Sequence, residues 1–119
     1  MAGFHQFIKI GRLAMIGGYA RVVKDIPPFV IAAGQKIRLY GLNSRGLIRR
    51  NFSSQLRKDL KTAYNYMTHS KYNLSKAIEE IRKNIPKSPE MDYFLNFIEN
   101  PSKMGMLTRG CNSKVKSAE

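Results

Sequence analysis

The stretch FHQFIK-IGRLAM-IGGYAR-VVKDIP-PFVIAA, residues 4–33, repeats every six residues. The first positions of its five blocks are Phe4, Ile10, Ile16, Val22 and Pro28. Two residues before the last four of these stand Ile8, Ala14, Ala20 and Ile26, and the second series continues with Ala32. An aliphatic residue every six, with a small or aliphatic residue at a fixed offset, is typical of a hexapeptide β-helix. In that fold one aliphatic side chain per short flat side points inward.

Other local structures fit this stretch less well. Strict alternation of apolar and polar residues fails at IGGYARVV, and a helix would have to contain Gly17, Gly18 and the pair Pro27-Pro28. Periodicity alone leaves an irregular glycine-rich β-meander open as an alternative. Because stacked repeats need about three units to bury a core, we expect the coils to be a truncated end of a longer solenoid.

From Ser53 onward the hydrophobic period changes to about 3.6, which predicts helices. Ser53 or Ser54 is a candidate N-cap, followed at helical spacing by Leu56, Leu60, Ala63, Tyr64 and Met67. Asn73 is the candidate cap of a second helix, with Leu74, Ala77, Ile78, Ile81 and Ile85 on one face and Pro86 as its stop. A third helix is predicted over Glu90–Glu99, with Met91, Phe94, Leu95 and Ile98 inward. Asn43–Arg50 is predicted to form one further turn.

These patterns divide the chain into four parts. We predict a truncated β-helix over residues 4–34, a linker with a short helix over 35–52, a helical domain over 53–109, and a disordered tail over 110–119. The fold class is therefore β-helix plus α.

Charge points to an anionic partner. The 119 residues carry 21 Lys and Arg against 8 Asp and Glu, a net charge of +13. The excess is densest in residues 36–61, where a single acid, Asp59, faces eight bases: Lys36, Arg38, Arg45, Arg49, Arg50, Arg57, Lys58 and Lys61. This segment is where we expect an anion to bind.

Several classes of protein are disfavoured. No apolar run approaches the ~20 residues of a membrane span, so we expect no transmembrane segment, and the N-terminus lacks the order of regions of a secretory signal. The single cysteine, Cys111, is expected to be an exposed thiol in a reducing cytoplasm. No Cys and His cluster suggests a metal, and no cofactor is predicted.

Three strings carry a family resemblance: HQFIKIGRLAMIGG (5–18), VVKDIPPFVIAAG (22–34) and YGLNSRGLIRRNFS (40–53). In this order and spacing they resemble the C-terminal part of the bacterial UDP-N-acetylglucosamine O-acyltransferases of lipid A biosynthesis. The third string is the most specific. The resemblance implies a left-handed parallel β-helix followed by a helical domain, assembled as a homotrimer once the β-helix is complete.

The resemblance also implies an activity. These enzymes move a 3-hydroxyacyl chain from acyl carrier protein to the 3-hydroxyl of UDP-N-acetylglucosamine, with a histidine as general base. In the family that base lies in coils before the HQF string, so we expect it upstream of residue 1. Neither histidine of this chain, His5 or His69, matches it. No residue here is therefore predicted to be catalytic.

The substrate-binding residues that the resemblance implies are His5, Gln6, Lys36, Asn43, Arg45, Arg49 and Arg50. His5 and Gln6 match a pair in the substrate cleft, and Asn43, Arg49 and Arg50 match the stretch that holds the nucleotide. The planar fork of arginine suits phosphate oxygens. Two positions depart from the family, which commonly has glutamate at Arg45 and histidine at Lys36. Both departures make the site more cationic.

Acyl carrier proteins are acidic, so Arg38, Arg57, Lys58 and Lys61 are candidates for docking one. Two other functions stay open. One is a basic, non-catalytic binding module for a nucleotide sugar, an acidic protein or nucleic acid, although no nucleic-acid motif occurs and no nucleic-acid partner is predicted. The other is a catalytically inactive remnant that holds substrate or supports trimerisation.

Overall fold

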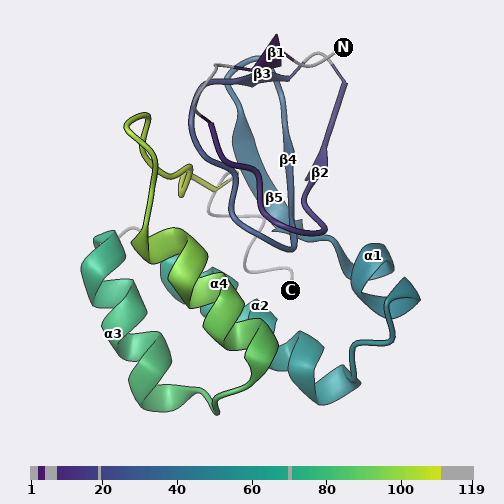
Figure 1. The fold of residues 1–119 in the computed structure, drawn as a ribbon, viewed down its shortest axis with the longest axis vertical. Helices are drawn as coiled ribbons and strands as arrows, with labels where there is room; N and C mark the ends of the chain where they lie inside the picture. The colour runs from purple at the N-terminus through teal and green to yellow at the C-terminus, as the bar shows by residue number, and fades with distance from the viewer. Residues whose placement is uncertain (1–2, 5–7, 19, 70, 111–119) are drawn as a thin grey trace.

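The computed structural model describes residues 3–4, 8–18, 20–69 and 71–110. Its strands are β1 (Gly3–Phe4), β2 (Met15–Ile16), β3 (Arg21–Val22), β4 (Val30–Ala33) and β5 (Arg38–Leu42). Its helices are α1 (Ser44–Arg49), α2 (Ser54–Thr68), α3 (Leu74–Asn84) and α4 (Pro89–Glu99). The strands form one end of the molecule and α2, α3 and α4 pack together at the other, with α1 to one side (Figure 1).

At the strand end the chain winds as in a solenoid, and we call this part the coil; each turn of the coil pairs in parallel with the next. β1 pairs with β3, which places Phe4 beside Val22, and β2 pairs with β4, which places Ile16 beside Ala32. A parallel bridge joins Ile10 to Ile26. The predicted stacking of short apolar strands along the chain is therefore present.

The six-residue frame shifts after Val22. Phe4 pairs with a residue eighteen positions later, whereas Ile10 and Ile16 pair with residues sixteen positions later. The turn that follows Val22 is two residues shorter than the repeat requires. Ile26, and not Pro28, therefore pairs with Ile10.

Gly11 lets the two turns of the coil approach closely at Pro28. A Cβ at position 11 would lie 2.4 Å from the backbone nitrogen of Pro28 and 2.5 Å from its Cα. We expect Gly11→Ala to lower the free energy of unfolding by about 1–3 kcal/mol, because neither backbone atom can rotate away. Urea denaturation measures the change.

Gly18→Ala is the matched control for Gly11→Ala. A Cβ at Gly18 meets no atom within 4 Å, so a loss within about 0.5 kcal/mol is expected. Equal losses from the two variants would show that the close approach at Pro28 does not matter.

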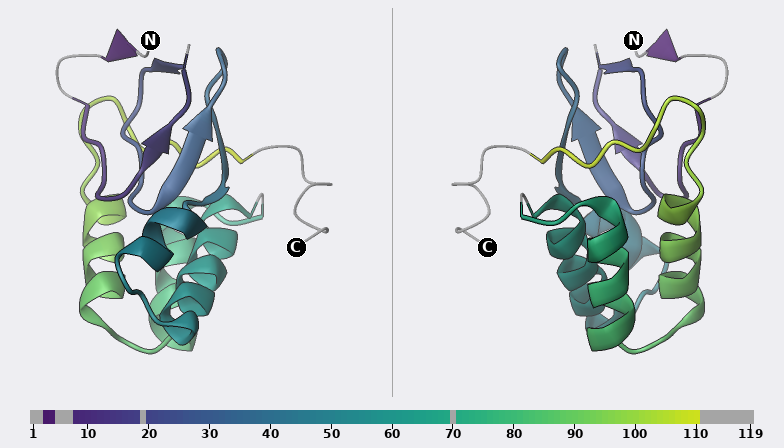
Figure 2. Two further views of the ribbon diagram at one scale, coloured as in Figure 1. Left: turned by 90° about the vertical axis from the view of Figure 1, so that its right-hand side faces the viewer. Right: turned by 90° about the vertical axis from the view of Figure 1, so that its left-hand side faces the viewer.

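The segment predicted as a linker contains a strand. β5 turns back after β4 and pairs with it antiparallel, with Ala32 beside Leu39. Gly34, at φ +97°, lies in the turn between them. The second edge of β5 pairs at Leu39 with the end of the C-terminal segment 100–110, where the Leu39 N–H donates to the Arg109 carbonyl at 3.0 Å. Figure 2 shows this segment rising from α4 and crossing beside the strands.

α2 and α3 begin at the predicted caps Ser53 and Asn73, whereas α4 begins at Pro89, one residue before the predicted start, and is capped by Ser88, which was not predicted. Ser53 Oγ accepts from the Leu56 N–H, Asn73 Oδ1 from the Lys76 N–H, and Ser88 Oγ from the Met91 N–H, at 3.0, 2.8 and 3.0 Å. Most of the predicted inward faces of the three helices are buried, at Leu60, Ala63, Tyr64, Met67, Ala77, Ile78, Ile81, Ile85, Met91, Phe94, Leu95 and Ile98. Leu56 and Leu74, at the starts of α2 and α3, are half-buried. No helix in the described part of the chain is long and apolar enough to cross a membrane.

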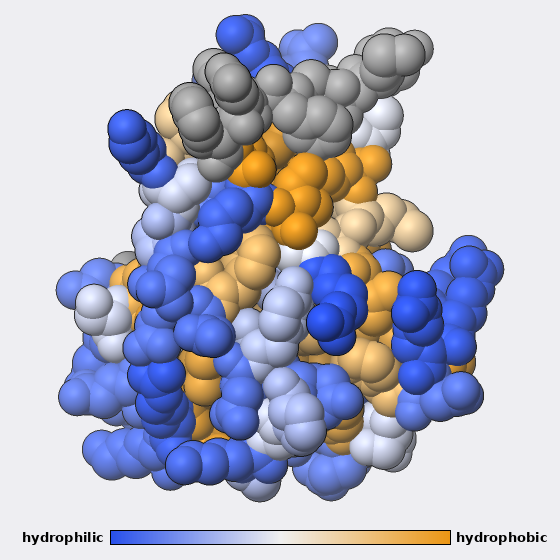
Figure 3. All heavy atoms as spheres, viewed as in Figure 1, coloured by the Kyte–Doolittle hydropathy of each residue, from blue (hydrophilic) through white to orange (hydrophobic). Residues whose placement is uncertain are grey.

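One apolar core joins the coil to the helices. Val22, Ile26, Val30, Ala32 and Leu39 from the coil belong to the same buried cluster as the helical faces. In the view of Figure 1, hydrophilic side chains cover the helices while hydrophobic ones gather over the strands (Figure 3). Of the first positions predicted to face inward, Ile10 is 41% exposed. Met15, the last residue of the same six-residue block, is 51% exposed. Some apolar surface of the coil thus stays uncovered by the described residues.

Candidate functional site

Helix α1 is held against the coil by Asn43. Its side chain is almost wholly buried, at 7% exposure. Nδ2 donates to the Leu13 carbonyl at 2.9 Å, and Oδ1 accepts from the Gly46 N–H at 3.2 Å as the N-cap of α1. The backbone N–H of Asn43 also donates to the Phe29 carbonyl at 2.8 Å. Asn43 therefore fixes where α1 starts and how it meets the coil.

Gly46 is required by this arrangement. A Cβ at position 46 would lie 2.5 Å from Nδ2 of Asn43, whose amide is already committed at both ends. One position later, Leu47 is fully buried and anchors the inner face of α1. The outer face of the helix is thereby fixed as well.

The outer face of α1 carries three arginines. Arg45, Arg49 and Arg50 are all exposed, and none forms an ion pair with a carboxylate of the described residues. Arg49 lies in the last turn and Arg50 is the C-cap. Three guanidinium groups on one short helix, set by a buried cap, make a cationic surface suited to phosphate oxygens.

The remaining predicted site residues lie elsewhere. Lys36 is exposed in the turn between β4 and β5 and lines a different hollow of the surface from α1. His5 and Gln6 lie outside the described residues. His69 is the exposed C-cap of α2, and its Nδ1 accepts from the Lys71 N–H at 3.1 Å. α2 has 15 residues, so His69 lies roughly 20 Å from the end that adjoins α1.

A groove beside α1 collects three of the four residues predicted to dock a carrier protein. Its volume is about 410 Å³, and Arg57, Lys58 and Lys61 of α2 line it together with Tyr40 and Ser44. Arg57 Nε donates to the Phe52 carbonyl at 3.3 Å, which fixes that side chain along the groove. Arg38, the fourth predicted residue, lines the hollow of Lys36 instead.

Sequence reasoning missed Asp25, which is fully buried. Its Oδ1 accepts from the Lys9 N–H at 3.0 Å and from Ser102 Oγ at 2.6 Å, and its Oδ2 accepts from the Ser102 N–H. Backbone bonds join Asp25 to Gly105 and Leu107. The only sequence signal is a carboxylate inside the apolar run VVKDIPPFV. No group of acidic, His or Cys side chains among the described residues could hold a metal ion.

Comparison with known proteins gives matches over most of the chain. Residues 25–110 match the model of a family described as UDP-N-acetylglucosamine O-acyltransferase, domain 2. An acyl-[acyl-carrier-protein]–UDP-N-acetylglucosamine O-acyltransferase of Burkholderia orbicola is 43% identical over 83 residues, which are 70% of this chain and 32% of that protein. The enzyme of the same name from Myxococcus xanthus is 37% identical over 106 residues, 89% of this chain and 41% of that protein.

Solved structures agree with the sequence matches. A UDP-N-acetylglucosamine acyltransferase from Bacteroides fragilis superposes with a TM-score of 0.82 at 39% identity, covering 87% of this chain and 40% of that one. The Acinetobacter baumannii structure gives 0.83 at 33% identity, covering 89% and 41%. The chain thus spans about a third of the length of the first of its curated relatives.

Proposed function

This chain belongs to the UDP-N-acetylglucosamine O-acyltransferase family, and from that premise we propose that α1 holds the nucleotide part of the substrate through Arg49 and Arg50. The single observation that carries the proposal is that α1 is fixed against the coil by buried contacts on its inner face. Asn43 and Leu47 are buried on its inner face, and its outer face carries two adjacent arginines that form no ion pair with a described carboxylate. A diphosphate offers enough oxygens to accept hydrogen bonds from both guanidinium groups.

The other predicted site residues have different roles in this proposal. Asn43 acts by orienting α1, since both ends of its amide are bonded within the chain. Arg45 adds a third positive charge where relatives commonly have a carboxylate. Lys36 keeps its proposed contact with the substrate as a point charge, from the turn between β4 and β5. His5 and Gln6 keep their proposed place in the substrate cleft.

The reaction proposed for the assembled enzyme is that of the relatives. A 3-hydroxyacyl chain would pass from acyl carrier protein to the 3-hydroxyl of UDP-N-acetylglucosamine, in lipid A biosynthesis in the cytoplasm. The basic groove of Arg57, Lys58 and Lys61 supports the docking of an acidic carrier protein. The coil is proposed to be part of a left-handed hexapeptide β-helix in a homotrimer. His69 is no part of this site, so the general base is proposed to come from preceding coils.

We expect the double variant Arg49→Ala/Arg50→Ala to bind uridine diphosphate at least about tenfold more weakly than the parent chain, because two charge-assisted contacts are lost. Isothermal titration calorimetry measures this, and affinity of the parent chain should fall as salt is raised. Lys83→Ala/Lys87→Ala removes the same charge from exposed positions, one in the last turn of α3 and one in the loop that follows it, and serves as the control. Equal weakening in both double variants would mean that net charge, and not α1, governs binding.

A single-stranded oligonucleotide in the same titration separates the alternative function. Salt-sensitive binding of the oligonucleotide, without binding of uridine diphosphate, would favour a basic binding module over the acyltransferase.

A further inference from the structure

A second cationic hollow lies between the β4–β5 hairpin and the C-terminal segment. Its volume is about 680 Å³, in the usual range for small-molecule sites. Five basic side chains line it: Arg21, Lys24, Lys36, Arg38 and Arg109. No carboxylate lies among its described lining residues. The arginines of α1 are not part of it.

The five charges are not neutralised within the described part of the chain. None of the five side chains forms an ion pair there. The acid that is next to Lys24 in sequence, Asp25, is fully buried and turns its carboxylate to Lys9 and Ser102. Charges of one sign gathered in a hollow favour an anionic ligand.

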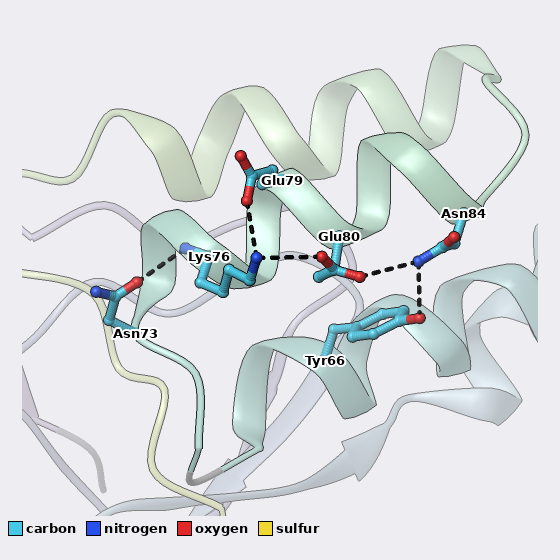
Figure 4. Close-up of polar contacts among 6 residues, drawn as sticks. All are labelled: Tyr66, Asn73, Lys76, Glu79, Glu80 and Asn84. Carbon is cyan, nitrogen blue, oxygen red and sulfur yellow. Dashed lines mark hydrogen bonds and ion pairs between the residues drawn. The ribbon is translucent and has the colours of Figure 1, made fainter.

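Cations at the opposite end of the molecule are arranged differently. On α3, Lys76 donates to Glu79 at 3.1 Å and lies 3.4 Å from Glu80 (Figure 4). Arg82 donates two hydrogen bonds of 2.7 Å to Glu99, which holds the pKa of that carboxyl below its usual value. The chain therefore pairs these two basic side chains of α3, whereas those of the hollow have no carboxylate partner among the described residues.

The walls of the hollow are fixed by backbone hydrogen bonds. One wall is the β4–β5 hairpin. The other is the C-terminal segment, which is tied to Asp25 through Gly105 and Leu107, at 2.8 Å in each case, and to Leu39 through Arg109 at 3.0 Å. Met106 and Leu107 are buried beneath the hollow. The backbone that carries the cations is thus ordered before any ligand arrives, which reduces the entropy cost of binding.

From this arrangement we propose that the hollow, named here the hairpin groove and defined by Arg21, Lys24, Lys36, Arg38 and Arg109, is an anion site for a ligand that carries a phosphate or diphosphate group. Arginine forks and lysine ammonium groups on both walls can share such a group's oxygens. The site is separate from α1 and does not depend on nucleotide binding there. A free phosphorylated molecule or a phospholipid head group would satisfy the same chemistry.

Titration of the whole chain with inorganic diphosphate, at low and at raised salt, tests the proposal. Arg38→Ala/Arg109→Ala removes one cation from each wall, and we expect it to weaken diphosphate binding about tenfold or more. Lys83→Ala/Lys87→Ala, with the same loss of charge, should stay within about twofold of the parent chain. Melting curves establish that each variant is folded.

Arg49→Ala/Arg50→Ala separates this proposal from that of the nucleotide site. If Arg49→Ala/Arg50→Ala lost diphosphate binding while Arg38→Ala/Arg109→Ala kept it, the proposal for the hairpin groove would be overturned and the proposed site at α1 would be supported. If Arg38→Ala/Arg109→Ala lost diphosphate binding while Arg49→Ala/Arg50→Ala kept it, the anion site in the hairpin groove would be supported, even if α1 did not bind the nucleotide. No diphosphate binding by the parent chain would also overturn the groove, unless binding of the head groups described next depends on Arg38 and Arg109.

Vesicles distinguish the two sources of phosphate. Co-sedimentation with vesicles of phosphatidylglycerol and phosphatidylethanolamine, lost in Arg38→Ala/Arg109→Ala but kept in the charge control, would assign the groove to phospholipid head groups. Diphosphate binding without vesicle binding would assign it to a free phosphorylated ligand. Equal vesicle binding by the two variants, with diphosphate binding also unchanged, would refute the site.

Discussion

Asp25→Ala is expected to lower the free energy of unfolding by about 3–5 kcal/mol and to release the C-terminal segment from the coil. The carboxylate accepts hydrogen bonds from the Lys9 N–H and from both the N–H and the hydroxyl of Ser102, in a site with no solvent exposure. Alanine leaves those three donors without an acceptor, and each stranded buried donor costs about 1–3 kcal/mol. Urea denaturation gives the total loss.

Hydrogen exchange shows where the effect of Asp25→Ala falls. The Leu39 and Leu107 amides donate across the junction between the coil and the C-terminal segment, to Arg109 and Asp25 respectively. Their protection should drop more than that of amides within α2. A uniform drop would mean that the segment is not a separate unit held by Asp25.

Two variants with smaller expected losses of stability serve as comparisons for Asp25→Ala. Asp25→Asn keeps an oxygen for Lys9 and Ser102 Oγ but turns an amide donor toward the Ser102 N–H, so a smaller loss of about 1–2 kcal/mol is expected. Ser102→Ala removes one donor and leaves the carboxylate two partners, with a loss of about 1 kcal/mol. If Asp25→Ala were no worse than Ser102→Ala, the carboxylate would not be the centre of the network.

The junction also shows what the sequence could not reveal. The helices were predictable because the residues that define them lie close together in sequence. The side chains of Ser53 and Asn73, for example, each accept a hydrogen bond from the backbone N–H three positions later. Asp25 and Ser102 are 77 residues apart, and the carboxylate inside the run VVKDIPPFV does not indicate which residue it would contact. A pairing of that separation leaves no periodic trace.

The coil lies between these two cases. Its six-residue repeat predicted stacked strands, but it could not show that the turn after Val22 is two residues short. Both Ile26 and Pro28 are apolar and both are buried, so composition gives no reason to prefer one frame. The frame is set by backbone bonds, such as the Gly11 N–H to the Ile26 carbonyl at 2.9 Å.

For the candidate site, the residue types were predictable but their division between surfaces was not. The family resemblance singled out Asn43 and Arg49 together, yet the first is a buried cap and the second an exposed cation. It also placed Lys36 with them, although the β4–β5 hairpin carries that side chain to the hairpin groove. β5 falls in a stretch predicted as linker, so its effect on Lys36 and Arg38 could not be foreseen.

Phe29→Ala is expected to be the most destabilising change of a single apolar side chain at the joint between coil and helices, by about 3–5 kcal/mol. Phe29 is fully buried, and its ring contacts three others at centroid distances of 5.7 Å for Phe52, 5.9 Å for Tyr93 and 6.4 Å for Phe94. Removing the ring leaves a cavity between the coil and the helices.

The backbone conformation of Phe29 allows a second test, in which alanine and glycine are compared at this position. Its φ is +70°, in the left-handed region where a side chain is strained by roughly 1 kcal/mol and glycine is not. Phe29→Ala loses the ring and keeps the strain, whereas Phe29→Gly loses the ring and relieves it. We therefore expect Phe29→Gly to be at least as stable as Phe29→Ala, the reverse of the usual order for these two residues.

Phe97 provides the matched control because it is an aromatic residue of α4 with ordinary helical backbone and partial exposure. Phe97→Ala should cost less than Phe29→Ala, and Phe97→Gly should be worse than Phe97→Ala by about 1 kcal/mol, since glycine is a poor helix former. The four variants, compared by urea denaturation, separate ring burial from backbone strain. If glycine were the worse substitution at both positions, the strained backbone at Phe29 would have no energetic weight, and its stability would rest on ring packing alone.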